Sequence, residues 1–296
     1  MVTTADEQRR APAGDSRWAE SWWFDFAARD ASLGGFARLS VHPHQGIAWC
    51  WAALVGDGRR LLLVRDQDLQ APRGQSLDVR GQGLWLSATC ETPLEHWSVG
   101  LEAFAVAFDD PREALVDERG DLVGLGLDLE WEAPGRAAGA SQTGYCQPCR
   151  VSGEILVADE QLVFDGVGFR GHGSGVEDWC HAPGEWSWGT FDGGEAFCAG
   201  SGGGTEPWAM RWRANAAEDL DLAAGAVSVT CDADGMLAGA RVGSEGEGSL
   251  AGSVVGTIPV LVEPVGGPRA RLLTGLARYR AAAGAQGVGW VARLVP

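Results

Sequence analysis

The chain of 296 residues contains no lysine, so all 23 of its basic residues are arginine. Schiff-base chemistry, lysine-bound pyridoxal phosphate and a lysine general base are therefore excluded. With 40 acidic residues, the formal net charge is −17. Nucleic acids and anionic membrane surfaces attract basic patches, so this excess of acid predicts that neither is a partner.

The sequence also lacks a long apolar run, a signal peptide and a disulfide framework. No stretch approaches the roughly 18 apolar residues of a transmembrane helix, so we expect no membrane span. The N-terminal segment is polar, without the apolar centre of a signal peptide, and we expect its first sixteen residues to be disordered. The seven cysteines are irregularly spaced, unlike a disulfide framework. A reduced, cytoplasmic protein is the expectation.

What the sequence does contain is a series of short apolar segments separated by turn signals. Trp22, Phe24 and Phe26 alternate with other residues, and a period of two is typical of a β-strand. Hairpins are expected across three turn sequences, namely Gly56-Asp57-Gly58, Asp159-Glu160 and Asp232-Ala233-Asp234-Gly235. Only residues 269–283 fit a helix equally well, because their Leu, Ala and Arg content favours one. The pattern predicts an all-β fold of barrels or sandwiches.

A small, turn-rich stretch at residues 132–142, EAPGRAAGASQ, divides the chain into two halves. Such stretches are typical of domain boundaries. We therefore predict an N-terminal domain at residues 1–135 and a C-terminal domain at residues 136–296. Each half has a suitable length for one closed or nearly closed antiparallel barrel.

The candidate functional site is the stretch from Phe164 to Asp192, which concentrates histidines, acids, indoles and glycines. Adjacent residues on a strand face opposite sides, so at most one of Glu177 and Asp178 points into a cavity. A carboxyl buried among indoles has a raised pKa and can act as a general acid. His172 could orient that acid or act as its base. An ordinary ion pair between Asp178 and an arginine remains the alternative.

Two groups of metal-ligand residue types are less informative. Cys146 and Cys149 form a CxxC motif, with Cys180-His181 further along the chain, and such a set could hold zinc. At that spacing, however, two strand residues face opposite sides. His42-Pro43-His44 is better explained as a loop, because proline interrupts strand pairing. We expect neither a metal nor a cofactor.

Several ordered motifs resemble a known group of proteins. They are Glu20-Ser21-Trp22-Trp23-Phe24, Leu33-Gly34-Gly35-Phe36, Tyr145-Cys146-Gln147-Pro148, Arg170-Gly171-His172, Asp178-Trp179, Trp186-Ser187-Trp188 and Phe191-Asp192-Gly193. Together they are similar to the AttH-like and carotenoid 1,2-hydratase-like group, whose motif runs roughly Arg-Asp-His-Ser-Trp-Gly-x-Arg-Asp-Trp. The resemblance implies two tandem lipocalin-like barrels with a ligand cavity, and cofactor-free chemistry on polyenes, terpenoids or polyketides. The motif histidine maps to His172, and its first aspartate falls on Gly171.

These observations lead to one main hypothesis and two alternatives. The main hypothesis is a cofactor-independent enzyme that cyclises or isomerises a hydrophobic, unsaturated terpenoid or polyketide by acid catalysis. The candidate catalytic residues are His172, Asp178 and Asp192, and the candidate substrate-binding residues are Trp22, Trp23, Tyr145, Glu177, Trp179, Trp186 and Trp188. The alternatives are a hydratase of an isolated double bond and a non-catalytic carrier of a hydrophobic ligand. A scaffold protein with a filled core is a further, weaker possibility.

Overall fold

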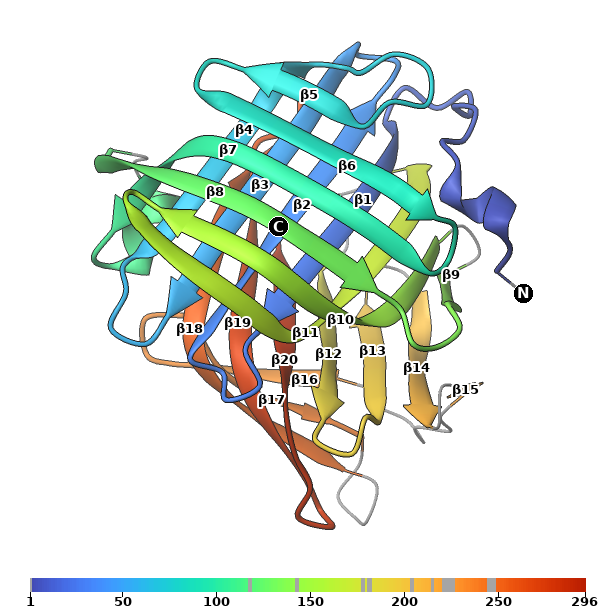
Figure 1. Cartoon of the computed structure of the whole chain (residues 1–296), viewed down its shortest axis with the longest axis vertical. Coiled ribbons are helices and arrows are strands. Elements are labelled where there is room, and N and C mark those ends of the chain that lie inside the picture. The colour runs from blue at the N-terminus through green and yellow to red at the C-terminus, as the bar shows by residue number, and fades with distance from the viewer. Residues whose placement is uncertain are drawn as a thin grey trace.

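The protein is built from two curled antiparallel β-sheets that lie one above the other (Figure 1). The computed structural model describes residues 2–116, 119–141, 144–176, 179, 183–202, 205–213, 216–219, 227–243 and 249–296. The predicted all-β class is confirmed. Among the described residues, none of the helices combines the length and apolar character that a membrane span requires.

The first sheet contains an eight-stranded barrel. Its strands follow the order β4-β3-β2-β1-β11-β10-β8-β7, and β7 pairs again with β4 through Leu61↔Phe108 to Leu63↔Val106, which closes the ring. Strands β6 and β5 extend from β7, and β9 pairs with β10. The strands are β1 (Trp18–Ala27), β2 (Leu33–His42), β3 (Ile47–Gly56), β4 (Leu61–Gln70), β5 (Asp78–Gly81), β6 (Leu84–Thr92), β7 (His96–Phe108), β8 (Asp121–Glu132), β9 (Ala138–Ser141), β10 (Gly144–Val157) and β11 (Glu160–Val176).

The second sheet contains nine strands in the order β15-β14-β13-β12-β20-β19-β18-β17-β16. The sheet curls and brings β16 close to β13, where the Ser201 hydroxyl donates a hydrogen bond to the Val227 carbonyl oxygen at 3.2 Å. Its strands are β12 (Gly184–Phe191), β13 (Ala196–Gly202), β14 (Thr205–Arg213), β15 (Ala216–Asp219), β16 (Val227–Cys231), β17 (Leu237–Val242), β18 (Leu250–Val262), β19 (Ala270–Ala281) and β20 (Gln286–Val295). Two short 3₁₀ helices, η1 (Thr4–Glu7) and η2 (Pro111–Leu115), complete the described elements.

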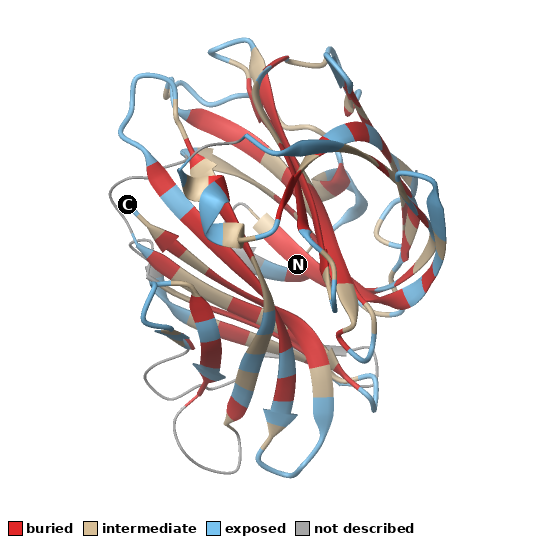
Figure 2. Ribbon diagram, turned by 90° about the vertical axis from the view of Figure 1, so that its left-hand side faces the viewer, coloured by how far each residue is buried: buried red, intermediate tan, exposed pale blue. Residues whose placement is uncertain are grey.

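Apolar side chains form three layers, one of which lies between the sheets. Alternate residues of each strand point into the first barrel, and side chains such as Phe24 and Phe26 fill it. The residues between them point outward, and side chains such as Phe36 and Trp51 pack against Trp290 and its neighbours on the second sheet. A third cluster fills the concave side of the second sheet. Buried residues follow the strands where the two sheets meet (Figure 2). The outer wall of the first barrel is thus itself a core surface.

The first sheet continues through β10 and β11 to Val176, and the division of the chain into domains at residues 1–135 and 136–296 stays a prediction. Strand β11 pairs with β1, which closes the barrel with a strand from the far end of the sequence. Disorder of the first sixteen residues was a wrong prediction, because Glu7 is only 6% exposed. Residues 270–281 form strand β19 rather than a helix.

Candidate functional site

A cavity of about 290 Å³ lies between the two sheets. Strands β1, β2, β10 and β11 form one wall, and strands β12, β13, β19 and β20 form the other. The first wall carries Trp23, Asp25, Arg38, Cys146, Phe169, Arg170 and Gly171, and the second carries Trp186, Trp188, Cys198, Leu272 and Ala292, with Trp179 between them in sequence. The lining is almost entirely apolar, so the few polar groups there determine what chemistry the cavity supports.

The alternation of strand residues places these side chains on the cavity side. Trp23 on β1 is in register with Gly171 on β11, which in turn is in register with Cys146 on β10. In-register residues of neighbouring strands share a face. A Cβ atom added to Gly171 would meet only the Tyr145 carbonyl oxygen, at 3.3 Å. Gly171 therefore leaves room in the wall where the resembling motif has an aspartate.

Asp25 supplies the carboxyl group of the cavity. It is 1% exposed, and three N–H groups donate to it: the Phe169 amide at 3.0 Å, the Trp188 indole at 2.7 Å and the Trp23 indole at 3.1 Å. Burial raises the pKa of Asp25 to about 7, against the opposing effect of these three donors. None of the donors carries a charge, so near neutral pH the group exists in both protonated and ionised forms.

Indole rings surround this acid. Trp23 stacks on Phe36 at 4.4 Å between ring centroids and meets Trp188 edge-on at 6.2 Å. Trp186 belongs to the same strand as Trp188 and lines the same cavity. Because aromatic faces carry negative electrostatic potential, they stabilise positive charge that develops beside them. The cavity thus places an acid next to surfaces suited to a cation.

Arg38 forms the second polar corner. Its guanidinium carbon lies 4.8 Å from the Trp51 ring centroid and 4.7 Å from that of Trp179. Its Nε donates to the Ser40 hydroxyl at 3.0 Å and its Nη2 to the Ser21 hydroxyl at 3.2 Å. The Arg38 side chain is therefore held by stacking on the two indole rings and by the hydrogen bonds that it donates to the two serine hydroxyls.

Two thiols meet at the cavity wall. Cys146 on β10 and Cys198 on β13 are both buried and free. A hydrogen bond between their side chains, together with burial, raises the pKa of Cys198 well above its usual range. Since the thiolate is the nucleophilic form, Cys198 is unsuited to nucleophilic catalysis at neutral pH.

Comparison with known proteins identifies the family. A domain family described as "Domain of unknown function (DUF7064)" matches residues 3–294. The chain belongs to the DUF7064 family. No curated protein matches the sequence.

Several solved structures share the fold of this DUF7064 protein. Kievitone hydratase from Nectria haematococca is 13% identical, with a TM-score of 0.63 over 99% of this chain and 93% of its own. An AttH protein from Nitrosomonas europaea is 15% identical, with a TM-score of 0.59 over 96% and 93%. CghA, solved with Sch210972, is 10% identical, with a TM-score of 0.57 over 97% and 93%. The resemblance to the AttH-like group is thus confirmed for the fold.

Four of the predicted site residues come together in the cavity of this DUF7064 protein. They are Trp23, Trp179, Trp186 and Trp188. Trp23 comes from the first barrel, whereas Trp186 and Trp188 come from the second sheet. The predicted clustering of indoles is therefore observed, but it lies between the sheets rather than within the C-terminal half.

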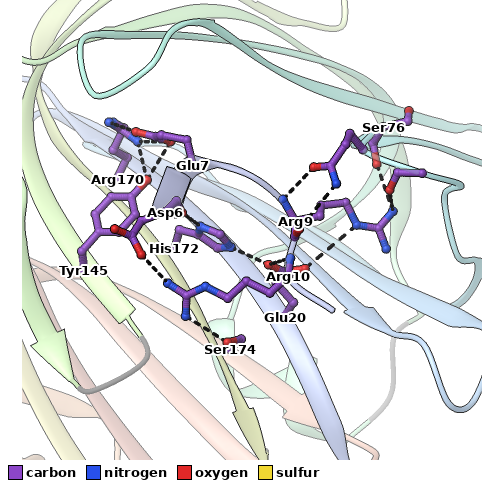
Figure 3. A network of polar contacts seen from close by, with 12 residues as sticks. Asp6, Glu7, Arg9, Arg10, Glu20, Ser76, Tyr145, Arg170, His172 and Ser174 are labelled. Carbon is purple, nitrogen blue, oxygen red and sulfur yellow. Dashed lines mark hydrogen bonds and ion pairs between the residues drawn. The ribbon is translucent and has the colours of Figure 1, made fainter. Parts of the chain in front are cut away.

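Three predicted site residues lie on the other face of β1, β10 and β11. His172 stacks on Trp22 at 4.6 Å, and its Nε2 contacts the Glu20 carboxylate at 2.9 Å. The Tyr145 hydroxyl donates to Glu7 at 2.8 Å. Figure 3 shows Tyr145 and His172 in this network, which includes residues of the N-terminal arm. Because of strand alternation, Trp22, Tyr145 and His172 point into the first barrel and away from the cavity.

Three predicted acids remain, namely Asp192, Glu177 and Asp178. Asp192 is exposed in the turn between β12 and β13. Glu177 and Asp178 lie outside the described residues. Their predicted roles stay predictions.

Asp25 and Arg38 were not among the sequence candidates. Asp25 sits in the alternating strand SWWFDFA, where a polar residue between aromatic ones normally marks the solvent face. One signal was available: Trp23 and Asp25 share a face, and an exposed strand face rarely carries a tryptophan beside an acid. That combination indicates a second layer covering the strand.

Proposed function

We propose that the cavity between the sheets is the active site of a cofactor-independent enzyme that cyclises or isomerises a hydrophobic, unsaturated substrate, with Asp25 as the general acid. The observation that carries the proposal is a carboxyl group with a pKa of about 7 in the wall of an apolar, indole-lined cavity. A catalytic acid works best when its pKa lies near the working pH.

The surroundings of Asp25 suit both halves of a proton cycle. Burial favours the protonated acid, which can give its proton to a substrate double bond or carbonyl oxygen. Once the proton has left, the carboxylate is stabilised by the amide of Phe169 and the indoles of Trp23 and Trp188. The same carboxylate can therefore take a proton back from the product cation, so no external acid or base is consumed.

In an acid-catalysed cyclisation, the proton leaves Asp25 and adds to one carbon of a double bond. The neighbouring carbon becomes a cation, and a second double bond of the same substrate attacks it, forming the ring bond. Trp23, Trp186 and Trp188 offer aromatic faces along the cavity for the positive charge. Loss of a proton to Asp25 then restores the acid. In a pericyclic variant, Asp25 instead polarises a carbonyl by hydrogen bonding.

The cavity's size and lining limit the substrate. A volume of about 290 Å³ is at the lower end of ordinary small-molecule pockets, which span roughly 300–1,000 Å³. A compact terpenoid or polyketide suits this space better than a long polyene. The shared fold with kievitone hydratase makes hydration of a double bond the second candidate, with water in place of the attacking double bond.

The test is to incubate the purified protein with compact isoprenoids, prenylated phenols and linear polyketides in deuterated water. Products are then analysed by liquid chromatography and mass spectrometry. Cyclisation or isomerisation gives a new retention time at the substrate's mass, apart from any deuterium gained in the proton cycle. Hydration adds the elements of one water molecule, with deuterium on the carbon that receives the proton. Asp25→Asn should lower turnover by about 10²–10⁴-fold, the usual contribution of a general acid.

The matched control is Asp128→Asn, which removes a carboxyl from an exposed position on β8 of the same barrel. Its turnover should equal that of the wild type. Full activity in Asp25→Asn would refute the assignment of the acid. A ligand that binds the wild type and returns chemically unchanged would instead identify a carrier.

A further inference from the structure

The N-terminal arm, defined here as residues 3–10, lies at the end of the first barrel where β4 connects to β5 and β6 connects to β7. Figure 3 shows Asp6, Glu7, Arg9 and Arg10 of the arm among their contacts. In the part of the chain that the structure describes, the backbone-to-backbone hydrogen bonds of the arm, Asp6 N–H to Thr3 O and Gln8 N–H to Ala5 O, stay within the arm. Its described hydrogen bonds with the barrel involve a side chain on at least one side, as between the Asp6 carbonyl oxygen and His172. The Arg9 guanidinium, for example, donates to the carbonyl oxygens of Pro72 and Gly74 at 2.8 Å each.

Glu7 inserts its carboxylate into a buried ring of donors. Oε1 accepts from the Leu94 amide at 2.9 Å and from Arg170 Nη2 at 2.7 Å. Oε2 accepts from the Trp97 indole at 3.0 Å, the Tyr145 hydroxyl at 2.8 Å and Arg170 Nη1 at 3.1 Å. The side chains of Glu7 and Arg170 are only 3% and 2% exposed. We call the four donor residues, Leu94, Trp97, Tyr145 and Arg170, the carboxylate cradle.

The cradle is formed by the barrel itself and would remain if Glu7 were taken away. Tyr145 and Arg170 come from the neighbouring strands β10 and β11, and Trp97 comes from β7. Burial raises the pKa of the Tyr145 hydroxyl above its usual range, which keeps it a donor. Arg170 presents two parallel N–H groups, the geometry that matches both oxygens of one carboxylate.

An empty cradle would be costly for the protein. A buried guanidinium without an anion loses its hydration and gains no compensating charge. Arg170 Nε is already buried without a hydrogen-bond partner among the described residues. The cradle therefore has a strong preference for an anion with two oxygens in one plane, and Glu7 supplies it from an arm whose backbone-to-backbone hydrogen bonds stay within the arm.

We propose that this end of the first barrel is a carboxylate-binding site and that Glu7 occupies it as an internal ligand. The class of molecule that the site accepts is a small organic carboxylate. Such a ligand enters when the arm withdraws, and it takes over the five hydrogen bonds that Glu7 makes. Arg170 also borders the cavity between the sheets, but its guanidinium and the Tyr145 hydroxyl meet Glu7 on the barrel side of β10 and β11, where Arg170 is in register with Phe24. The carboxylate-binding site and the cavity therefore lie on opposite faces of these strands.

The experiment uses the full chain with Glu7→Ala, which removes a CH₂–COO⁻ group, and acetate as the probe because it replaces the missing atoms. Thermal unfolding is measured in sodium acetate and in sodium chloride of equal ionic strength. We expect the variant's Tm to rise saturably with acetate, by at least about 2–4 °C, the shift that corresponds to 1 kcal/mol in a chain of this size. The wild type should show no such difference between the salts.

A second readout locates the binding. In protein labelled with ¹⁵N at the indole nitrogens, the Trp97 signal, assigned with Trp97→Phe, should move in Glu7→Ala and return with acetate. Glu7→Gln is the control, because its amide fills the same space and leaves acetate no room. If Glu7→Ala purifies unfolded, refolding yield in the two salts becomes the measurement. Equal yields or Tm values in both salts, or an equal acetate effect in Glu7→Gln, would overturn the proposal.

Discussion

Strands β1 and β11 carry a buried polar centre on each face, and the two centres differ in their partners. On the cavity face, Asp25 accepts three hydrogen bonds from neutral N–H groups. On the barrel face, Glu7 meets the guanidinium of Arg170. Neutral donors leave a buried carboxyl able to exchange a proton near pH 7, whereas a guanidinium is permanently charged. One pair of strands thus separates a group suited to chemistry from a group suited to holding an anion.

The largest effect should come from breaking the charged centre. Arg170→Ala leaves the Glu7 carboxylate buried without its cation, and removing one partner of a buried pair costs about 3–5 kcal/mol. We expect a loss of this size in the free energy of unfolding, measured by denaturant titration. Arg150→Ala is the matched control, because Arg150 pairs with Asp165 on the surface. An equal loss in both variants would show that burial of the pair is not what matters.

A smaller effect should appear in the pH dependence of stability, through Asp25. Its folded pKa of about 7 lies above the ordinary value of 3.8, so the folded state binds this proton more tightly than the unfolded state. Its stabilising contribution is complete below about pH 4 and is lost as the pH rises to about 7. The loss is on the order of 4 kcal/mol at most. The free energy of unfolding of the wild type should therefore fall with rising pH across this range more steeply than that of Asp25→Asn. Parallel plots of this free energy against pH for the two proteins would contradict the raised pKa.

The smallest effect should distinguish Trp188 from Trp186 by their influence on the pKa of Asp25. Trp188→Phe keeps an aromatic ring but removes the shortest donor to Asp25, at 2.7 Å. Because that donor favours the carboxylate, its loss should raise the pKa of Asp25 further. Titration of the Asp25 carboxyl carbon by ¹³C NMR measures the shift. Trp186→Phe, which lines the same cavity but is not among the three donors, should leave the pKa of Asp25 unchanged.

Local features of the fold could be predicted from the sequence, and distant partners could not. The turn at Asp159-Glu160 was expected, and β10 and β11 do pair from Arg150↔Val167 to Val157↔Glu160. Nothing near residues 144–176 reveals that β11 pairs with β1. Such long-range pairing depends on barrel closure, which local alternation does not encode.

In the candidate site, too, the residues chosen from their local sequence were found, and a residue that depends on distant partners was missed. Trp186 and Trp188 were chosen from their own segment, and they do line the cavity. Asp25 was missed because its burial requires a second sheet on the outer wall of the barrel, supplied by residues more than 150 positions away. The disorder expected for the N-terminus failed for a similar reason. Polar composition predicted it, but Glu7 finds its donors at residues 94, 97, 145 and 170.

The Trp188 hydrogen bond to Asp25 has one further consequence, because it crosses from one sheet to the other. The other two donors, Trp23 and Phe169, belong to the first barrel and move with Asp25. Of the three donors, only Trp188 on β12 depends on how the second sheet is positioned against the first barrel. A slip of a fraction of an ångström between them would therefore change the acidity of Asp25, and the proton affinity of this one side chain would report the alignment of the whole molecule.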